Sequence, residues 1–388
     1  MTKTSDKNVT IYDSTLREGE QMPGVRFTAE QKVEIATMLI EAGVPQIEAG
    51  FAAVSEGERK AIKSIVAIGG DAEILSLSRT KKEDIDAALS CDVDIILLFI
   101  ATSDLHMKKK LKMSQGQVLD AIGSSVEYAK DHGVKVALST EDTTRSDRAF
   151  LVKAYSKAAE CGADRLGITD TLGCATPEMI EELVEFVAGI SDLPVSVHLH
   201  DDFGLALANA LVAVGAGAKA VATTVCGFGE RAGNVPLEQF VMAMKHLYRN
   251  DLGIKTENLT EIARKVSGFA GVNLPPTQPW VGPNAFAHES GIHVAAVLKD
   301  PRTYEFLPPE TVGNARRIVM GKHSGRSLIS ARLSEKGMEA PKELLDDIFR
   351  RVKELGEEKG DVNDQEFWSI VAKAKLSLIK AESRKRQG

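Results

Sequence analysis

The feature that most constrains the fold is an alternation of short β-rich runs with helical patterns along most of the chain. Eight runs have the composition of strands: Val9–Asp13, Gln46–Gly50, Glu73–Leu77, Ile95–Ile100, Val134–Ser139, Arg165–Thr169, Val195–His200 and Ala220–Val225. Eight βα units in roughly 250 residues are typical of an α/β fold of the (β/α)8 TIM-barrel type. An open, doubly wound sheet is the alternative, because counting strands does not show whether the sheet closes.

The pattern changes near residue 273, where the run NLPPTQPW carries three prolines in eight residues and is typical of a linker. Helix-like spacing of apolar residues returns at 341–356 and 365–381. We therefore predict a catalytic barrel at 1–272, a connector at 273–326 and a small helical C-terminal subdomain at 327–388.

The charge and cysteine content narrow the class of protein. A net charge of -7 argues against nucleic acid as a partner, and no run of about 20 apolar residues indicates a membrane span. The four cysteines form no CxxC pair, which favours reduced thiols over disulfides. The polar start, MTKTSDKNVT, lacks the apolar core of a signal peptide. These features predict a cytoplasmic protein.

The ends of the predicted strands carry polar residues, and the carboxyl ends of barrel strands are where TIM-barrel enzymes place their chemistry. His198 and His200 are two residues apart on one strand, so both rings point the same way. Two imidazoles and a carboxylate form a common divalent metal site, and Glu18 is the predicted carboxylate. The alternative to a metal site is that both histidines are structural residues whose rings form hydrogen bonds within the barrel. Asp201 and Asp202 are alternative ligands, or they cap the following helix.

Two further residues near these strand ends suit the same site. The guanidinium of Arg17 could hold a carbonyl oxygen as it becomes an enolate or alkoxide, although an ion pair with Glu18 or Glu20 would also explain it. The oxygen of Asn234, within the glycine-rich run GFGERAGN, could supply another metal ligand.

Five segments of the chain resemble one family in the same order: DSTLREGEQMPGV, SVHLHDDFGLALANAL, GFGERAGNVPLE, AFAHESGIHV and GKHSGR. They look like the alkylmalate and homocitrate synthases of the DRE-TIM metallolyase superfamily, to which citramalate and Re-face citrate synthases are related. The resemblance implies a (β/α)8 barrel, a divalent metal (Zn, Mn, Mg or Co), and acetyl-CoA and a 2-oxo acid as substrates. It also implies a homodimer whose connector reaches the partner subunit's barrel.

The resemblance assigns roles to individual residues. The metal ligands that it implies are Glu18, His198, His200 and Asn234. The catalytic residues are Arg17, Glu141 and His293, of which His293 belongs to the neighbouring subunit. The substrate-binding residues are Gln21, Leu77, Ser139 and Thr171.

The implied reaction is a Claisen-type condensation of acetyl-CoA with the 2-oxo acid, made irreversible by hydrolysis of the thioester. Lysine-pathway homocitrate synthases bind a distal carboxylate with a histidine and an arginine, and this chain has Leu77 and Ala137 at the aligned positions. An apolar Leu77 favours an alkyl substrate, so the prediction is a 2-isopropylmalate synthase of the short form, without the leucine-binding regulatory domain. The alternatives are homocitrate synthase, then citramalate or Re-citrate synthase, and last a hydroxyacyl-CoA lyase.

Overall fold

The computed structural model describes residues 9–387, so most of the polar start of the chain, residues 1–8, lies outside the described part. The chain divides into two compact units, Met1–Leu274 and Pro275–Gly388. Each unit is described by itself. The predicted division of the second part at residue 326 stays a prediction.

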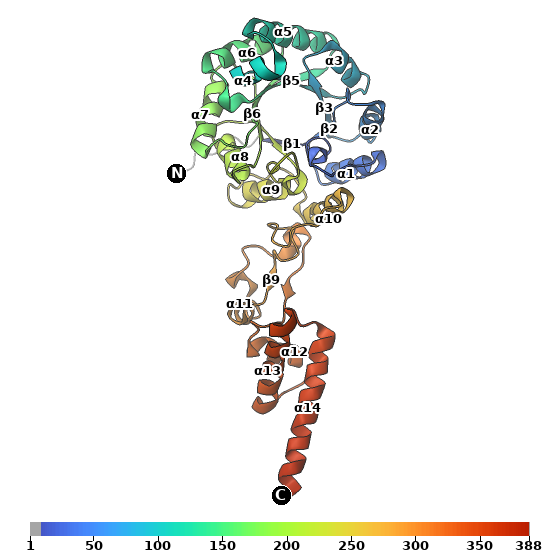
Figure 1. Ribbon diagram of the computed structural model, residues 1–388, viewed down its shortest axis with the longest axis vertical. Helices are drawn as coiled ribbons and strands as arrows, with labels where there is room; N and C mark the ends of the chain where they lie inside the picture. The colour runs from blue at the N-terminus through green and yellow to red at the C-terminus, as the bar shows by residue number, and fades with distance from the viewer. Residues whose placement is uncertain (1–8, 388) are drawn as a thin grey trace. The chain divides into compact units, whose positions relative to one another are not determined.

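The first unit contains a closed barrel of eight parallel strands in the order of the sequence (Figure 1). The strands are β1 (Thr10–Asp13), β2 (Gln46–Gly50), β3 (Glu73–Arg79), β4 (Ile95–Ala101), β5 (Lys135–Glu141), β6 (Arg165–Asp170), β7 (Val195–Leu199) and β8 (Ala220–Thr223). Pairing of β1 with β8, in the register Thr10↔Ala220, closes the sheet. The barrel prediction is confirmed, and closure excludes the open doubly wound sheet.

Helices follow the strands and lie around the barrel (Figure 1). They are α1 (Ala29–Glu41), α2 (Glu56–Val66), α3 (Lys82–Leu89), α4 (Asp104–His106), α5 (Gln115–Asp131), α6 (Arg148–Glu160), α7 (Pro177–Ala188), α8 (Ala206–Gly215), α9 (Leu237–His246) and α10 (Leu259–Ala270). Local sequence sets their starts. The Thr28 hydroxyl accepts from the Gln31 backbone N–H, and the Gln31 side chain accepts from the Thr28 N–H, a capping box at α1.

The interior of the barrel is apolar and supports the polar loops at its mouth. Side chains from five strands fill it: Tyr12, Leu75, Leu77, Ile95, Leu97, Ala137, Ala220 and Ala222. Because these strands are paired on both sides and covered by helices, their carboxyl ends form a rigid platform.

The second unit contains β9 (Ala287–His288), β10 (Arg317–Ile318), α11 (Gly291–Val297), α12 (Arg326–Ser334), α13 (Lys342–Lys359) and α14 (Asp364–Gln387). Most of its core residues lie on α12, α13 and α14, among them Ile329, Ile348 and Phe367. The helical spacing predicted for 341–356 and 365–381 corresponds to α13 and α14. Within residues 9–387, no helix is long and apolar enough to span a membrane.

Candidate metal and substrate site

A pocket lies at the mouth of the barrel, where the strands end. Nine residues singled out from the sequence line it: Arg17, Glu18, Gln21, Leu77, Ser139, Glu141, Thr171, His198 and His200. They come from five strands or the loops that follow them, so the barrel brings together segments that are far apart in the sequence. This is the end at which TIM-barrel enzymes carry their active sites.

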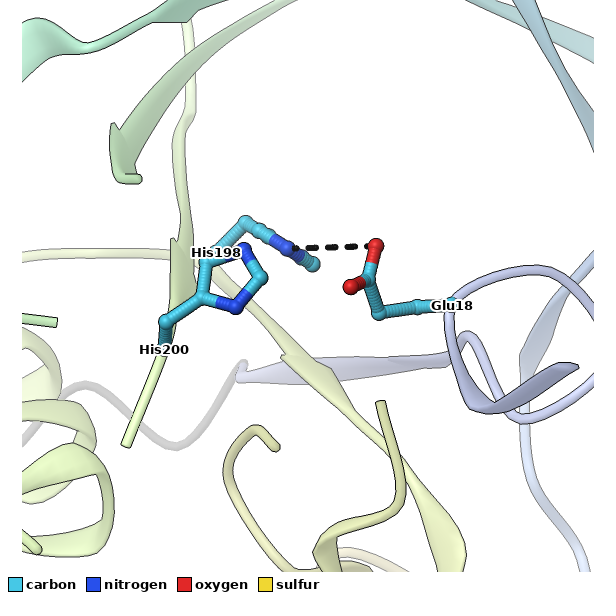
Figure 2. A group of neighbouring side chains, drawn as sticks. All are labelled: Glu18, His198 and His200. Atoms are coloured by element: carbon cyan, nitrogen blue, oxygen red, sulfur yellow. Dashed lines mark ion pairs between the residues drawn. The ribbon is translucent and has the colours of Figure 1, made fainter. Parts of the chain in front are cut away.

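The centre of the pocket is a carboxylate with two imidazoles (Figure 2). Glu18, His198 and His200 each offer a ligand atom, and these atoms lie within 4.8 Å of one another. The His198 Nε2 atom is 3.9 Å from Glu18 Oε2, and the centroids of the two imidazole rings are 5.0 Å apart. His198 lies on β7 and His200 directly follows it, so the alternation of side chains along a strand turns both rings toward Glu18.

The electrostatics of this cluster keep each group in the form that binds a cation. Burial lowers the pKa of His198 to about 3 and also lowers the pKa of His200, so both rings are neutral near pH 7. Burial alone would raise the pKa of Glu18, but the opposing effect of the neighbouring groups, led by the positive charge of Arg17, outweighs it and holds that pKa at about 2. Neutral imidazoles and an ionised carboxylate are what a divalent metal requires.

Asn234 is paired with one residue of the cluster. A short bridge joins its backbone to that of His200, and its buried side-chain Oδ1 has no hydrogen-bond partner among residues 9–387. A side chain at Gly229 would come within 2.1 Å of the Asn234 amide nitrogen, which explains why the loop has glycine there. A buried amide oxygen on a residue bridged to His200 has the chemistry of a metal ligand, and the ligand role of Asn234 stays a prediction.

The aspartates after β7 have other partners. The Asp201 side chain accepts from the backbone N–H of Ala206, the first residue of α8. The Asp202 carboxylate pairs with Arg231, with an Nε to Oδ1 distance of 2.8 Å. The N-cap position of α8 is Leu205, so the prediction that one of these aspartates is the N-cap residue is wrong, although Asp201 binds the first N–H of the helix. The structure gives neither aspartate a place in the metal cluster.

Arg17 is held by two carboxylates. Its Nε and Nη2 donate to the two oxygens of Glu48 at 2.8 and 3.0 Å, and its Nη1 contacts Glu18. Glu48 lies on β2, is fully buried, and also accepts from the Ser14 hydroxyl. The expected pair with Glu18 is present, whereas Glu20 pairs with Lys32 instead. This two-point contact fixes the plane of the guanidinium beside the metal cluster.

The opposite wall carries a second ion pair. Both oxygens of Glu141, at the end of β5, accept from Lys110 Nζ at 2.6 and 2.7 Å. The Thr171 hydroxyl accepts from the Asp142 backbone N–H, and the Thr171 carbonyl accepts from Arg231. These contacts position the residues that the family resemblance placed near the substrate.

One side of the pocket is apolar. Leu77 and Leu97 line it beside Phe99 and Tyr12. Leu77 is 9% exposed, so its side chain forms part of the surface that a ligand would meet. Ala137, which was aligned with the arginine of the lysine-pathway homocitrate synthases, instead lines a hollow at the other end of the barrel. Its part in the argument about the distal carboxylate is not supported by the geometry.

Three residues that pair with side chains at the barrel mouth were given no role from the sequence. Glu48 reads as an ordinary polar strand residue, Lys110 as part of a solvated lysine run, and Arg231 as one charge in a flexible loop. Their roles depend on the partners that the fold supplies, Arg17, Glu141 and Asp202. The sequence signal that could have found them is their position, because Glu48 lies on a barrel strand and Lys110 and Arg231 lie in segments that follow one.

His293 lies in the second unit, on α11. Its ring is exposed and stacks on Tyr304 at a centroid distance of 4.0 Å. The predicted role of His293 in a partner subunit's site therefore stays a prediction.

A closed (β/α)8 barrel with a carboxylate–imidazole cluster at its mouth defines a metal-binding TIM-barrel enzyme. The family model described as HMGL-like matches residues 8–266, and that described as homocitrate synthase post-HMGL domain-like matches residues 280–360. The chain belongs to the HMGL-like family, with the post-HMGL domain of the homocitrate synthases. The predicted superfamily is confirmed.

The chain is similar over almost its full length to named synthases. It is 54% identical to a homocitrate synthase of Methanopyrus kandleri, covering 94% of this chain and 91% of that protein. It is 48% identical to a 2-isopropylmalate synthase of Sulfurisphaera tokodaii, covering 98% and 97%. A hydroxymethylglutaryl-CoA lyase structure from Pseudomonas aeruginosa has the same barrel fold, with a TM-score of 0.64, 21% identity, and coverage of 70% of this chain and 96% of that one.

These similarities confirm the predicted enzyme class, a synthase of the type that condenses acetyl-CoA with 2-oxo acids. The family depends on a divalent metal, which agrees with the cluster at the barrel mouth. Because the two relatives are named for different products at comparable identity, similarity does not select the 2-oxo acid.

Proposed function

We propose that this chain is an acetyl-CoA:2-oxo acid acyltransferase that joins the acetyl group to a small 2-oxo acid and then hydrolyses the thioester. The observation that carries the proposal is the buried cluster of Glu18, His198 and His200 with the guanidinium of Arg17 beside it. Such an arrangement suits the two oxygens of a 2-oxo carboxylate, which need a cation and an oriented hydrogen-bond donor.

The proposed metal is a divalent ion, Zn, Mn, Mg or Co, held by Glu18, His198 and His200 with Asn234 as a further ligand. When bound, it would supply Lewis acidity that polarises the carbonyl of the 2-oxo acid. The preorganised donors support this, because the imidazoles are already neutral and the carboxylate is already ionised.

The protein residues around the cluster have separate tasks. Arg17, oriented by Glu48, donates to the carbonyl oxygen and stabilises the negative charge that grows there. Glu141 serves in proton transfer, and its pairing with Lys110 holds it in place. Gln21, Ser139 and Thr171 line the pocket and bind the polar part of the 2-oxo acid.

The proposed 2-oxo acid has a branched alkyl end, as in 2-oxoisovalerate, which makes the chain a 2-isopropylmalate synthase. The pocket wall formed by Leu77, Leu97 and Phe99 suits such a group. Each basic residue that lines the pocket already has a carboxylate partner, so a second substrate carboxylate would find no unpaired cation there. Homocitrate synthase, with 2-oxoglutarate as substrate, is the second candidate because of the similarity to the Methanopyrus kandleri protein.

The substrate proposal is tested by release of free thiol from acetyl-CoA with pyruvate, 2-oxoisovalerate, oxaloacetate and 2-oxoglutarate in parallel. We expect kcat/KM to be highest for 2-oxoisovalerate, because its methyl groups contact the apolar wall. Pyruvate should be slower by about tenfold or more, since each lost methylene contact is worth roughly 1–3 kcal/mol. A preference for 2-oxoglutarate would contradict the proposed alkyl pocket and favour homocitrate synthase.

We also propose that the protein is a homodimer in which His293 of one chain serves the barrel of the other. An exposed imidazole held against Tyr304 is suited to meet a ligand outside its own unit. The proposal extends the family resemblance of the run AFAHESGIHV.

Mixing two inactive variants tests this exchange. Alone, Glu18→Gln and His293→Ala should each be nearly inactive. When they are mixed and allowed to exchange subunits, about a quarter of the sites should combine an intact barrel with an intact His293, and activity should return. As a control, a mixture of Glu18→Gln with a Glu18→Gln/His293→Ala double variant should stay inactive. No recovery, despite subunit exchange shown by mass spectrometry, would refute the shared site.

A further inference from the structure

We propose that the lysine-rich turn Met107–Lys112 is the binding site for the phosphate groups of coenzyme A. The inference rests on the proposed function only in its choice of ligand, and it adds the place where the nucleotide end binds. No family match or similarity assigns a role to this turn. Three features of the turn support the assignment: its position at the pocket, the shape of its backbone and its unpaired charge.

The turn lies at the mouth of the substrate pocket. It follows β4 through the short helix α4, and its Lys110 lines the same pocket as the metal cluster. Lys110 Nζ lies 2.6 Å from Glu141 Oε1, while half of the lysine side chain is exposed. The turn therefore meets the pocket wall at Lys110, and its other lysines are exposed to solvent.

The backbone of the turn is held in an unusual shape. Residues Met107–Leu111 form a π-helical turn, and Lys112 has a left-handed φ of 56°. The N–H groups of Lys112 and Met113 both donate to the Met107 carbonyl, and the Met107 side chain is buried. π-Turns and left-handed residues other than glycine are uncommon and concentrate at functional sites. This backbone therefore holds the Cα positions of the lysines in place.

The charges of the turn are only partly balanced. Lys108 lies 3.8 Å from Asp104, with both side chains largely exposed, and Lys110 pairs with Glu141. Lys109 and Lys112 are exposed and form no ion pair within residues 9–387. In a chain with a net charge of -7, this leaves a local positive patch beside an otherwise acidic protein.

Coenzyme A has matching chemistry. Its pantetheine arm carries the thiol, and its nucleotide carries a diphosphate and a 3′-phosphate, so a cluster of ammonium groups at the far end of the pocket is complementary to it. With the acetyl group near Glu18, the arm would leave the pocket past Lys110. The phosphates would then meet Lys109 and Lys112.

Titration calorimetry of the full-length chain tests the assignment directly. CoA is titrated into the wild type and into a Lys109→Ala/Lys112→Ala variant, with and without a 2-oxo acid. We expect the Kd for CoA to rise about tenfold in the variant, equivalent to about 1.4 kcal/mol, because two solvent-exposed ammonium partners of the phosphates are removed. Pantetheine, which lacks the phosphates, should bind both proteins equally. A Lys63→Ala/Lys153→Ala variant, which removes two exposed lysines from α2 and α6, should bind CoA like the wild type.

The outcomes separate this inference from the proposed function. Equal CoA affinity in wild type and variant, equal loss for CoA and pantetheine, or no binding of CoA to the wild type would each overturn the phosphate site. If CoA binds with the expected pattern but no 2-oxo acid causes thiol release from acetyl-CoA, the phosphate site stands and the proposed reaction fails.

Discussion

The Glu18→Gln variant is expected to lose bound metal and at least about a thousandfold in kcat/KM. Glu18 is the one carboxylate of the cluster, and its pKa of about 2 means that it carries a full negative charge at working pH. Glutamine keeps the shape and removes the charge, leaving two neutral imidazoles to hold a dication. A metal contributes several kcal/mol to stabilising the transition state, and 1.36 kcal/mol corresponds to a factor of ten in rate.

Metal content by emission spectroscopy and thiol release by absorbance measure the two losses in the same samples. The matched control is Glu230→Gln, which removes a carboxylate from the same pocket wall and leaves the cluster intact. The control should keep its metal. A Glu18→Gln protein with full metal content and wild-type turnover would show that the cluster is not the metal site.

Arg17→Lys is expected to keep the metal and lose about 100- to 1000-fold in kcat. Lysine preserves the charge but cannot donate to both oxygens of Glu48 and also aim an N–H at the substrate, so the oriented donor is lost. Removal of one such donor to a developing oxyanion typically costs that factor.

The lysine variant is preferred to alanine for a structural reason. Glu48 is fully buried, and alanine at position 17 would leave it without its cation, at a cost of about 3–5 kcal/mol in folding free energy. Thermal unfolding monitors this effect separately from kinetics. Wild-type kcat in Arg17→Lys, or loss of metal from it, would contradict the role given to the guanidinium.

The sequence was most informative where a local rule decides the geometry. The two-residue spacing of His198 and His200 predicted that both rings face the same way, and the structure places them together against Glu18. The start of α1 is equally local, because the capping box of Thr28 and Gln31 is satisfied within four residues.

Features that depend on distant partners could not be predicted in the same way. Closure of the barrel joins Thr10 to Ala220, and no local pattern encodes such a pairing. The role of Glu48 appears only when β2 lies beside the loop after β1, and that of Lys110 only when its turn meets β5. The apolar wall likewise combines Leu77 of β3 with Leu97 and Phe99 of β4, of which only Leu77 was singled out.

A metal-dependent condensation of acetyl-CoA at the barrel mouth is tested most directly by measuring thiol release from metal-free wild-type protein before and after metal is returned. The chain is treated with a chelator, dialysed, and assayed with acetyl-CoA and 2-oxoisovalerate while Zn, Mn, Mg or Co is added back. We predict no release from the metal-free protein and recovery with at least one of these ions, together with a 2-alkylmalate product identified by mass spectrometry. Undiminished thiol release from protein shown to contain no metal would contradict a metal-dependent condensation.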